Sequence, residues 1–415
     1  MLRWLVSLAA SLPAIAGADF YKDVLPILQN RCQECHRPGK IAPMHFLSYQ
    51  DTRPWAKAIR EAVVTRKMPP WFADPRYGHF SNDRSLSRAE IDTILHWADA
   101  GAPAGDPKDA PPSRRWPEGW NIGTPDAVFE MPKAFPIPAS GAIEYQYIII
   151  PTHFQEDTWV QQVEVRPSDA ATVHHAVVYI REPGSEWLKG RPRGEAFGLP
   201  IRNSLTTSDI LLVYTPGNSF DGWKPGMAKK IKAGSDLVLQ MHYTAKGKSS
   251  QDRTRIGIVF AKEPPKQAVL TLQMGSDTFV IPPGDPDYRV PVSGTLPNDA
   301  LLISLFPHMH LRGKAFEYLA ASTNGAFTPL LKVNNYDFNW QLNYRLAEPL
   351  RLRAGTRLAV AGYFDNSANN PRNPDPAAEV RFGEQSWEEM MIGFFDVAVD
   401  AVIDKTTFFQ RRAVK

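Results

Sequence analysis

The sequence predicts a multidomain protein in which a small all-α domain precedes two all-β domains of the antiparallel sandwich, jelly-roll-like type. Apolar residues recur at helical spacing in residues 19–105, and a Pro-rich stretch follows at residues 106–125. Short runs rich in Val, Ile, Tyr and Phe then alternate with turn residues, and AKEPPKQ interrupts them. We therefore expect a linker at 106–125 and two β domains at 126–262 and 268–412.

The first residues predict an exported protein. Arg3 precedes an apolar run from Trp4 to Ile15, and small residues complete the pattern of a signal peptide over residues 1–18. A retained N-terminal anchor is the alternative. No later stretch approaches the length of a membrane helix, so we expect a periplasmic or secreted protein with no integral membrane segment after cleavage. The formal net charge of +3 is nearly balanced and favours no nucleic-acid partner.

Three short helices are expected in the first domain. Apolar residues at helical spacing predict the first over residues 19–30, and a second is expected over 52–67 with Pro54 in its first turn. The third begins at Ser87, because Ser87 and Glu90 have the spacing of a capping box. Gly101 is expected to end it.

The only two cysteines of the chain, Cys32 and Cys35, are followed directly by His36. The pattern C-x-x-C-H is typical of covalent haem c attachment, in which both thiols bond to the haem and the histidine is an axial iron ligand. A thioredoxin-like redox pair is the alternative, but no βαβ pattern surrounds the motif and His36 would have no role. With its three helices, the segment 19–105 resembles the class I cytochromes c.

Met68 is the expected sixth ligand of the haem iron. It lies in RKMPPW, where two prolines stiffen an extended segment after the second helix, and Met44 is the alternative. Ligation by methionine and histidine leaves no open position on the iron, which favours electron transfer. The other histidines of this region are expected at the surface or in packing: His45, His79 and His96.

The β region contains six histidines, and five of them fall into compact groups, namely His174 with His175, His242 alone, and His308 with His310. Residues two apart on a strand share one face, so His308 and His310 can grip one ion together. His174 and His175 are neighbours, so an ideal strand would point them in opposite directions unless it is locally twisted. Structural hydrogen-bonding roles are the alternative for each group, and His153 is expected to be structural.

Met390 and Met391 follow two glutamates near the C-terminus. Methionine in such a segment is usually a core residue, but a thioether close to imidazoles is a soft ligand that selects copper, above all Cu(I). The order HH, H-Y, H-x-H and E-E-M along residues 125 to 410 resembles the copper type II, ascorbate-dependent monooxygenases. That family includes peptidylglycine α-hydroxylating monooxygenase and dopamine β-monooxygenase.

The resemblance implies two copper ions and two β-sandwich domains facing each other across a solvent-filled cleft. It implies that a triple-histidine set holds the electron-transfer copper, and this set is His174, His175 and His242. It implies that a methionine set holds the copper at which dioxygen is activated, and this set is His308, His310 and Met390. Met390 is preferred to Met391 because it directly follows the acidic pair. The β region has no cysteine, unlike the disulfide-rich animal enzymes.

We therefore expect an exported copper monooxygenase that hydroxylates a C–H bond of a small-molecule or peptide-like substrate with O2. Electrons would reach it from an external donor through the fused cytochrome c, which is an inference from the fusion alone. One alternative is a non-catalytic electron-transfer or copper-binding protein with the same ligands. Another is a carbohydrate-binding or surface-protein sandwich in which the histidines are structural.

Overall fold

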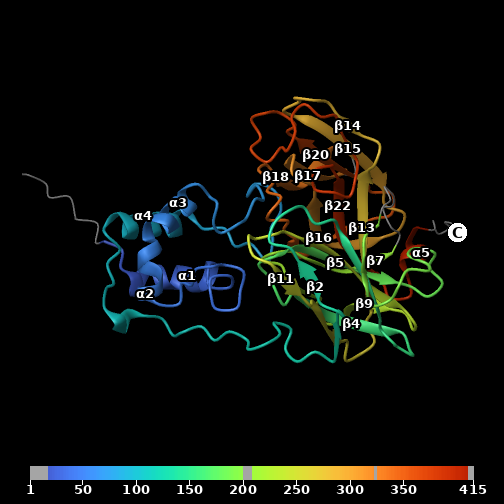
Figure 1. Ribbon diagram of the computed structural model, residues 1–415, viewed down its shortest axis with the longest axis horizontal. Helices are drawn as coiled ribbons and strands as arrows, with labels where there is room; N and C mark the ends of the chain where they lie inside the picture. The colour runs from blue at the N-terminus through green and yellow to red at the C-terminus, as the bar shows by residue number, and fades with distance from the viewer. Residues whose placement is uncertain (1–16, 200–207, 322–324, 410–415) are drawn as a thin grey trace, which may run out of the picture. The chain divides into compact units, whose positions relative to one another are not determined.

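The computed structural model describes residues 17–199, 208–321 and 325–409, which form two compact units (Figure 1). The helical unit holds the chain up to Pro70 together with Arg84–Arg115. The β unit holds Trp71–Asp83 together with the chain from Trp116 onward. The signal peptide expected over residues 1–18 lies almost wholly outside the described residues.

Short helical segments make up the helical unit. In order they are η1 (Phe20–Val24), α1 (Leu25–Arg31), α2 (Tyr49–Thr52), η2 (Arg53–Trp55), α3 (Ala56–Val64), α4 (Arg88–Asp99) and η3 (Pro107–Asp109). They enclose a core that includes Phe20, Leu28 and Trp97. The capping box at the start of α4 is confirmed, because the Ser87 hydroxyl accepts from the Glu90 N–H and the Glu90 carboxylate accepts from the Ser87 N–H.

The expected fold class, a small all-α cytochrome c domain followed by two all-β copper domains, is wrong. Strands make up 38% of the described residues and helices only 13%, and these residues show no small all-α cytochrome c domain. The segment expected as one helix over 52–67 is divided into a turn of α2, the 3₁₀ turn η2 and α3. Pro54 lies in η2, where a proline, which lacks an N–H, interrupts regular α-helical hydrogen bonding.

The described residues of the N-terminal half of the β unit form twelve strands. They are β1 (Ala127–Glu130), β2 (Phe135–Ile137), β3 (Gln146–Pro151), β4 (Thr158–Arg166), β5 (Val173–Arg181), β6 (Ala196–Phe197), β7 (Asp209–Tyr214), β8 (Phe220–Gly222), β9 (Met227–Ile231), β10 (Asp236–Tyr243), β11 (Ser250–Asp252) and β12 (Arg255–Phe260). A five-stranded sheet in the order β6-β3-β10-β5-β7 covers the core of this half.

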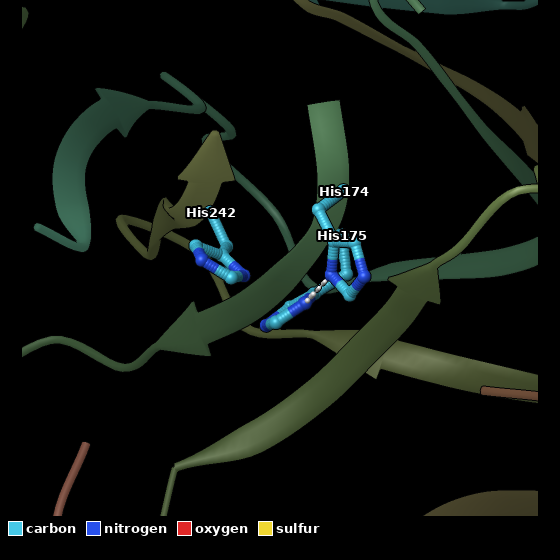
Figure 2. A group of neighbouring side chains, drawn as sticks. All are labelled: His174, His175 and His242. Carbon is cyan, nitrogen blue, oxygen red and sulfur yellow. Dashed lines mark hydrogen bonds between the residues drawn. The ribbon is translucent and has the colours of Figure 1, made fainter. Parts of the chain in front are cut away.

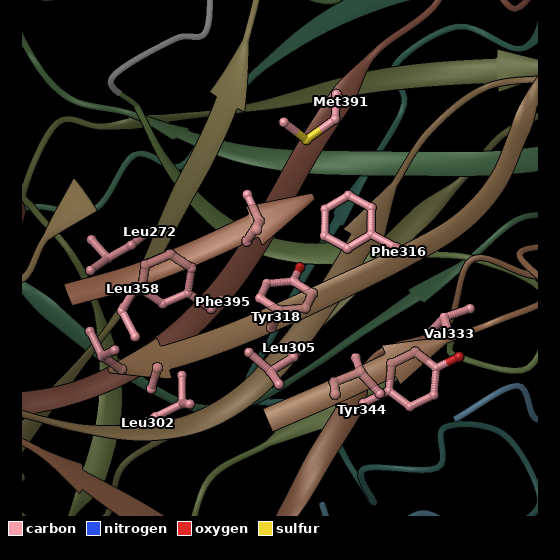
Figure 3. Close-up of a cluster of buried hydrophobic side chains, with 14 of the residues drawn as sticks. Leu272, Leu302, Leu305, Phe316, Tyr318, Val333, Tyr344, Leu358, Met391 and Phe395 are labelled. Atoms are coloured by element: carbon pink, nitrogen blue, oxygen red, sulfur yellow. The ribbon is translucent and has the colours of Figure 1, made fainter. Parts of the chain in front are cut away.

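Ten strands and a short helix, α5 (Lys405–Phe409), are found in the part of the C-terminal half that the structure describes. The strands are β13 (Gln267–Ser276), β14 (Val280–Ile281), β15 (Tyr288–Thr295), β16 (Ala300–His308), β17 (Gly313–Ala321), β18 (Phe327–Val333), β19 (Tyr344–Leu352), β20 (Arg357–Phe364), β21 (Val380–Arg381) and β22 (Met391–Asp400). A four-stranded sheet in the order β15-β20-β17-β18 covers its core, part of which is shown in Figure 3.

One nine-stranded sheet joins the two halves. Its main path runs β1-β12-β4-β9-β13-β22-β16-β19, and β8 pairs with β4 at its side. The halves meet where β9 pairs in parallel with β13, through Met227 opposite Gln267 and Ala228 opposite Ala268. Backbone hydrogen bonds therefore continue from one half of the β unit into the other.

The segment Trp71–Asp83 interrupts the helical unit and packs on the C-terminal half. Two isolated bridges hold it, Ala73 with Val333 and Phe80 with Leu346. The Trp71 ring also makes an edge contact with the buried Tyr344, at 5.0 Å between centroids. Among the described residues, no helix is both long enough and apolar enough to cross a membrane.

Candidate metal centre

Neighbouring strands bring the triple-histidine set together. In the antiparallel pairing of β5 with β10, His175 lies opposite His242, and the next pair is Val173 with Tyr243. His174 is thus the extra residue of a β-bulge, which turns its side chain away from the direction that strict alternation would give. Figure 2 shows the three rings gathered at one place, and their ligand nitrogens lie within 4.8 Å of one another.

The nitrogen positions in this set suit a shared ion. His174 Nδ1 and His175 Nδ1 are 3.1 Å apart. Two nitrogens bound at about 2.0 Å to one ion in tetrahedral geometry are separated by about 3.3 Å. His242 Nδ1 is buried and has no hydrogen-bond partner among the described residues. An uncompensated buried imidazole nitrogen is costly, and a metal ion bound there would remove that cost.

Aromatic side chains fix the orientation of these rings. The Tyr145 hydroxyl is 3.2 Å from His175 Nε2, and the Tyr145 ring stacks on His242 at 4.7 Å between centroids. Phe338, from the C-terminal half, stacks on His174 at 4.4 Å. The set therefore receives support from both halves of the β unit.

The methionine set begins at the end of β16. His308 is the last residue of that strand and His310 lies just beyond it, so the expected strand alternation does not extend to both residues. Their ring centroids are nevertheless only 5.2 Å apart. Met309, between them, is fully buried and packs into the core of the C-terminal half. The two imidazoles thus lie away from that core.

Each imidazole of the methionine set has its Nδ1 occupied by a hydrogen bond. His308 Nδ1–H donates to Gln341 Oε1 at 2.6 Å, and His310 Nδ1–H donates to the Glu388 carbonyl at 3.3 Å. Nε2 of each ring is then the nitrogen that carries a free lone pair. His310 Nε2 is buried without a hydrogen-bond partner among the described residues. This arrangement is usual for metal-binding histidines, whose second nitrogen donates to a carbonyl or carboxylate oxygen.

Met390 and Met391 occupy different environments. Met391 is fully buried in the core of the C-terminal half, where Figure 3 labels it. Met390 is partly buried and lines a cavity of about 70 Å³ together with His175 and His308. Of the two thioethers, Met390 is the one that shares a cavity with imidazoles.

Burial keeps the five imidazoles neutral. It lowers the pKa of His174 to about 4, of His242 to about 3 and of His308 to about 4. It also holds the pKa of His175 and His310 well below the usual value. Neutral imidazole is the form that binds metal ions, so the ligands need not lose a proton at neutral pH.

Glu389 supports the loops that carry the methionine set. It is fully buried, and burial raises its pKa to about 8. Its carboxylate accepts from the backbone N–H groups of His310 at 2.9 Å and Arg312 at 2.6 Å. Glu389 directly precedes Met390 in the chain. Its side chain therefore connects the segment that carries Met390 to the backbone of His310.

The two ligand sets meet in the same cavity. The rings of His175 and His308 make an edge contact at 5.9 Å between centroids. Aromatic residues dominate the cavity wall, among them Tyr145, Tyr147, Tyr179, Trp187, Phe306, Phe382 and Phe394. Glu384 supplies one carboxylate, which accepts a hydrogen bond from the Tyr147 hydroxyl at 3.2 Å.

The C-x-x-C-H residues lie in the turn that follows α1. The His36 N–H donates to the Cys32 carbonyl at 3.0 Å, and the Cys35 N–H donates to the same oxygen at 3.1 Å. Neither thiol is in a disulfide. His36 stacks on Phe46 at 4.3 Å, and its Nδ1–H donates to the Met44 carbonyl at 3.1 Å, leaving Nε2 as the nitrogen with a free lone pair.

The two methionines considered as the sixth haem ligand lie in different parts of the helical unit. Met44 is partly buried and packs against the core of that unit. Met68 is partly buried in the turn after α3, where its N–H donates to the Ala62 carbonyl at 3.0 Å. No contact of either sulfur with His36 distinguishes them, so Met68 stays a prediction. His153, expected to be structural, is an exposed turn residue with φ 58°.

Several supporting residues have no signal in the sequence. Gln341, Phe338 and Tyr145 lie far along the chain from the histidines that they contact, and none belongs to a recognisable motif. The bulge at His174 could have been suspected, because two adjacent histidines can serve one ion only if the strand is irregular there.

No protein-family model and no curated protein matches the chain. Solved structures share only weak likeness with it. The major capsid protein P2 of bacteriophage PM2 is 8% identical, with 66% of this chain and 96% of that chain covered at a TM-score of 0.29. PNGF-II is 12% identical, with coverages of 66% and 65% and a TM-score of 0.29, and an allantoicase is 8% identical, with coverages of 56% and 80% and a TM-score of 0.17. None of these likenesses assigns a function.

Proposed function

We propose that the protein is an exported copper-dependent monooxygenase that hydroxylates a C–H bond with O2 and receives electrons through a covalently bound haem. One observation carries the proposal: one imidazole from each set, His175 and His308, lines an aromatic-walled cavity together with the Met390 thioether, and the other three imidazoles stand beside these two. A carbohydrate-binding or surface-protein sandwich does not require several histidines and a methionine beside one cavity. The order of these ligands along the chain, which resembles the copper type II monooxygenases, is the second support.

The donor atoms favour copper over other ions. Imidazole suits zinc, copper, iron and nickel, whereas a thioether is a soft donor that favours Cu(I). The triple-histidine set offers nitrogen donors only, and Nδ1 of His174 and Nδ1 of His175 have the spacing of two ligands on one ion. The methionine set adds one sulfur to two nitrogens. The two sets therefore fit two copper ions of different character.

The proposed reaction consumes one O2, two electrons and two protons, and it yields a hydroxylated product and water. Copper, when bound, supplies the redox chemistry that O2 activation requires. Gln341 and the Glu388 carbonyl hold the two imidazoles of the methionine set in one tautomer. The aromatic wall excludes bulk water and binds apolar parts of a small-molecule or peptide-like substrate.

Haem attachment is the second part of the proposal. Cys32, Cys35 and His36 lie in one turn, and the hydrogen bond from His36 Nδ1 to the Met44 carbonyl leaves Nε2 as the nitrogen that would bind the iron. Burial raises the pKa of the Cys32 thiol to about 12 and also raises that of Cys35. A thioredoxin-like pair needs a low thiol pKa, so this environment disfavours that alternative. Met68 remains our preferred sixth ligand, and an external donor would reduce the haem.

Metal content combined with oxygen consumption tests the proposal. Protein matured with haem and loaded with copper should hold two copper ions per chain and consume O2 only when a reductant and a substrate are supplied. His308→Ala should abolish the consumption, whereas His153→Ala, which changes an exposed histidine, should preserve it. Two bound copper ions with no oxygen uptake across a panel of apolar and peptide-like substrates would favour the non-catalytic electron-transfer or copper-binding alternative.

A further inference from the structure

The aromatic-lined cavity has two ends of different chemistry. On β5, His175, Val177 and Tyr179 all line it, because residues at every second position of a strand share one face. On β10, Gln240 lines it two residues before His242. A strand rises about 3.3 Å per residue, so the backbone at Tyr179 lies about 13 Å from the backbone at His175. The end beside Tyr179 is therefore separate from the end that carries the candidate metal ligands.

A single carboxylate belongs to the tyrosine end of the cavity. Among the described residues that line the cavity, Glu384 is the only one with a carboxylate. It accepts a hydrogen bond from the Tyr147 hydroxyl, to which the Gln240 side chain also donates. The negative charge of Glu384 adds to burial in raising the pKa values of Tyr147 and Tyr179, so the carboxylate acts on both rings.

Glu384 is half-buried and has no cationic partner in the protein. Burial raises the pKa of its carboxyl group. No lysine or arginine in the part of the chain that the structure describes forms an ion pair with it, and the neutral Tyr147 hydroxyl is its hydrogen-bond donor. A carboxylate that is partly removed from water without a counter-charge is unfavourable. A cation bound beside Glu384 would offset that cost.

Aromatic rings form the wall of the cavity beside this carboxylate. Tyr147, Tyr179, Trp187 and Phe382 all line it. The rings of Tyr179 and Trp187 meet edge to face at 5.1 Å between centroids, so their faces point in different directions. A cation within about 6 Å of a ring centroid is attracted to the face of the ring, and several such rings together are typical of sites for quaternary ammonium groups.

We propose that the tyrosine end of the cavity binds a methylated ammonium group, and that the substrate carries this group. The inference rests on the proposed function for calling the ligand a substrate, and it goes beyond that function in naming the substrate class. A primary ammonium has three N–H donors that need acceptors, whereas a trimethylammonium group has none and packs against aromatic faces. Binding beside Glu384 also keeps the positive group apart from the candidate metal ligands.

Calorimetric titration of the full chain, prepared without copper, tests the site with three probes. Choline carries a trimethylammonium group, 3,3-dimethyl-1-butanol is its uncharged isostere, and ethanolamine carries a primary ammonium. Choline should bind at least about tenfold more tightly than either of the others. Glu384→Gln keeps an oxygen for the Tyr147 hydroxyl, and it should lower choline affinity about tenfold without changing that of the isostere. Trp187→Leu, which removes a ring face, should act in the same direction.

Glu144→Gln is the matched control, because it makes the same change of charge at an exposed residue that does not line the cavity. Its choline affinity should equal that of the wild type. Circular dichroism of each variant, matching that of the wild type, establishes that a loss of affinity is not unfolding.

Three results would overturn the site. Choline could bind no more tightly than its isostere, ethanolamine could bind more tightly than choline, or Glu384→Gln could leave choline affinity unchanged. Neither copper nor turnover enters this measurement, so the cation site and the monooxygenase are judged separately. Selective choline binding with no oxygen uptake by the copper-loaded protein would support the site and reject the enzyme. Oxygen uptake with uncharged substrates, without selective choline binding, would do the reverse.

Discussion

His308 Nδ1–H donates to Gln341 Oε1 across 2.6 Å, and both side chains are buried. This hydrogen bond fixes the imidazole in the tautomer whose Nε2 is free, and it limits rotation of the ring. Gln341 is held in turn through its backbone carbonyl, which accepts from Thr215. The orientation of a proposed copper ligand thus depends on a residue outside every motif.

Replacing Gln341 by leucine should weaken copper binding at the methionine set. The variant keeps the backbone contact with Thr215 but loses the acceptor for His308, and loss of such a partner costs about 10- to 100-fold in metal affinity. Competition titration with a Cu(I) chelator measures the change. Gln273→Leu is the matched control, because Gln273 lines the same cavity with no described contact to a ligand. Equal losses in both variants would contradict the assigned role.

The adjacent methionines should separate metal binding from stability. Met390→Ala should lower Cu(I) affinity at the methionine set, spare the triple-histidine set and change the thermal midpoint little, because Met390 is only partly buried. Met391→Ala removes a fully buried side chain and should cost about 2–5 kcal/mol of unfolding free energy. Copper titration and thermal unfolding of both variants check this. A copper loss confined to Met391→Ala would reverse the assignment.

Lys229→Met should strongly destabilise the β unit. The substitution leaves the Asp396 carboxylate on β22 without its cationic partner on β9. Breaking a buried ion pair by removing one partner costs about 3–5 kcal/mol of unfolding free energy. Urea unfolding followed by tryptophan fluorescence measures the shift of the midpoint. Lys133→Met breaks an exposed pair with Glu195 and should have little effect. If apolar packing mainly stabilised the contact between the two halves of the β unit, both variants would instead have similar urea midpoints.

Covalent haem should depend on both cysteines. Protein matured by a c-type haem apparatus should keep its haem through denaturing electrophoresis, and Cys35→Ala should retain it less firmly because one thioether bond is missing. The double variant Cys32→Ala/Cys35→Ala should lose the haem stain completely. Haem that stays on the denatured double variant would refute covalent attachment at this motif.

The reduction potential should identify the sixth ligand. Thioether ligation raises the potential of a histidine-ligated haem, so Met68→Ala should lower it and Met44→Ala should change it little. Potentiometric titration of both variants gives the comparison. The opposite pattern would assign the role to Met44, whose backbone carbonyl already contacts His36.

Local patterns predicted local structure well. The capping box at Ser87 and the strands that carry His175, His242 and His308 follow from spacing and composition, and the structure confirms them. The sequence did not reveal how the strands are assembled at longer range. A Pro-rich break between residues 261 and 267 suggested separate domains, yet the strands on either side of it belong to one sheet.

For the candidate site as well, the sequence predicted the residues but not their arrangement in space. Residue types and their order predicted six candidate ligand positions, because imidazole and thioether groups are common metal ligands. The distance between the two sets could not be predicted, since it depends on how β9 pairs with β13 and on contacts such as Thr215 with Gln341. Pairing between strands remote in sequence is set by the packing of whole layers, and no short motif records it.

The segment Trp71–Asp83 has a consequence for how the two units can be inherited. It lies within the stretch of sequence that otherwise builds the helical unit, but it covers Val333, Tyr344 and Leu346 of the C-terminal half. A gene fragment that begins at residue 116 would lack Trp71–Asp83, and the apolar residues that this segment covers would be exposed to solvent. The two units are therefore interleaved in the sequence. Recombination that replaced the helical unit by a foreign domain would have to keep Trp71–Asp83 or supply a segment in its place.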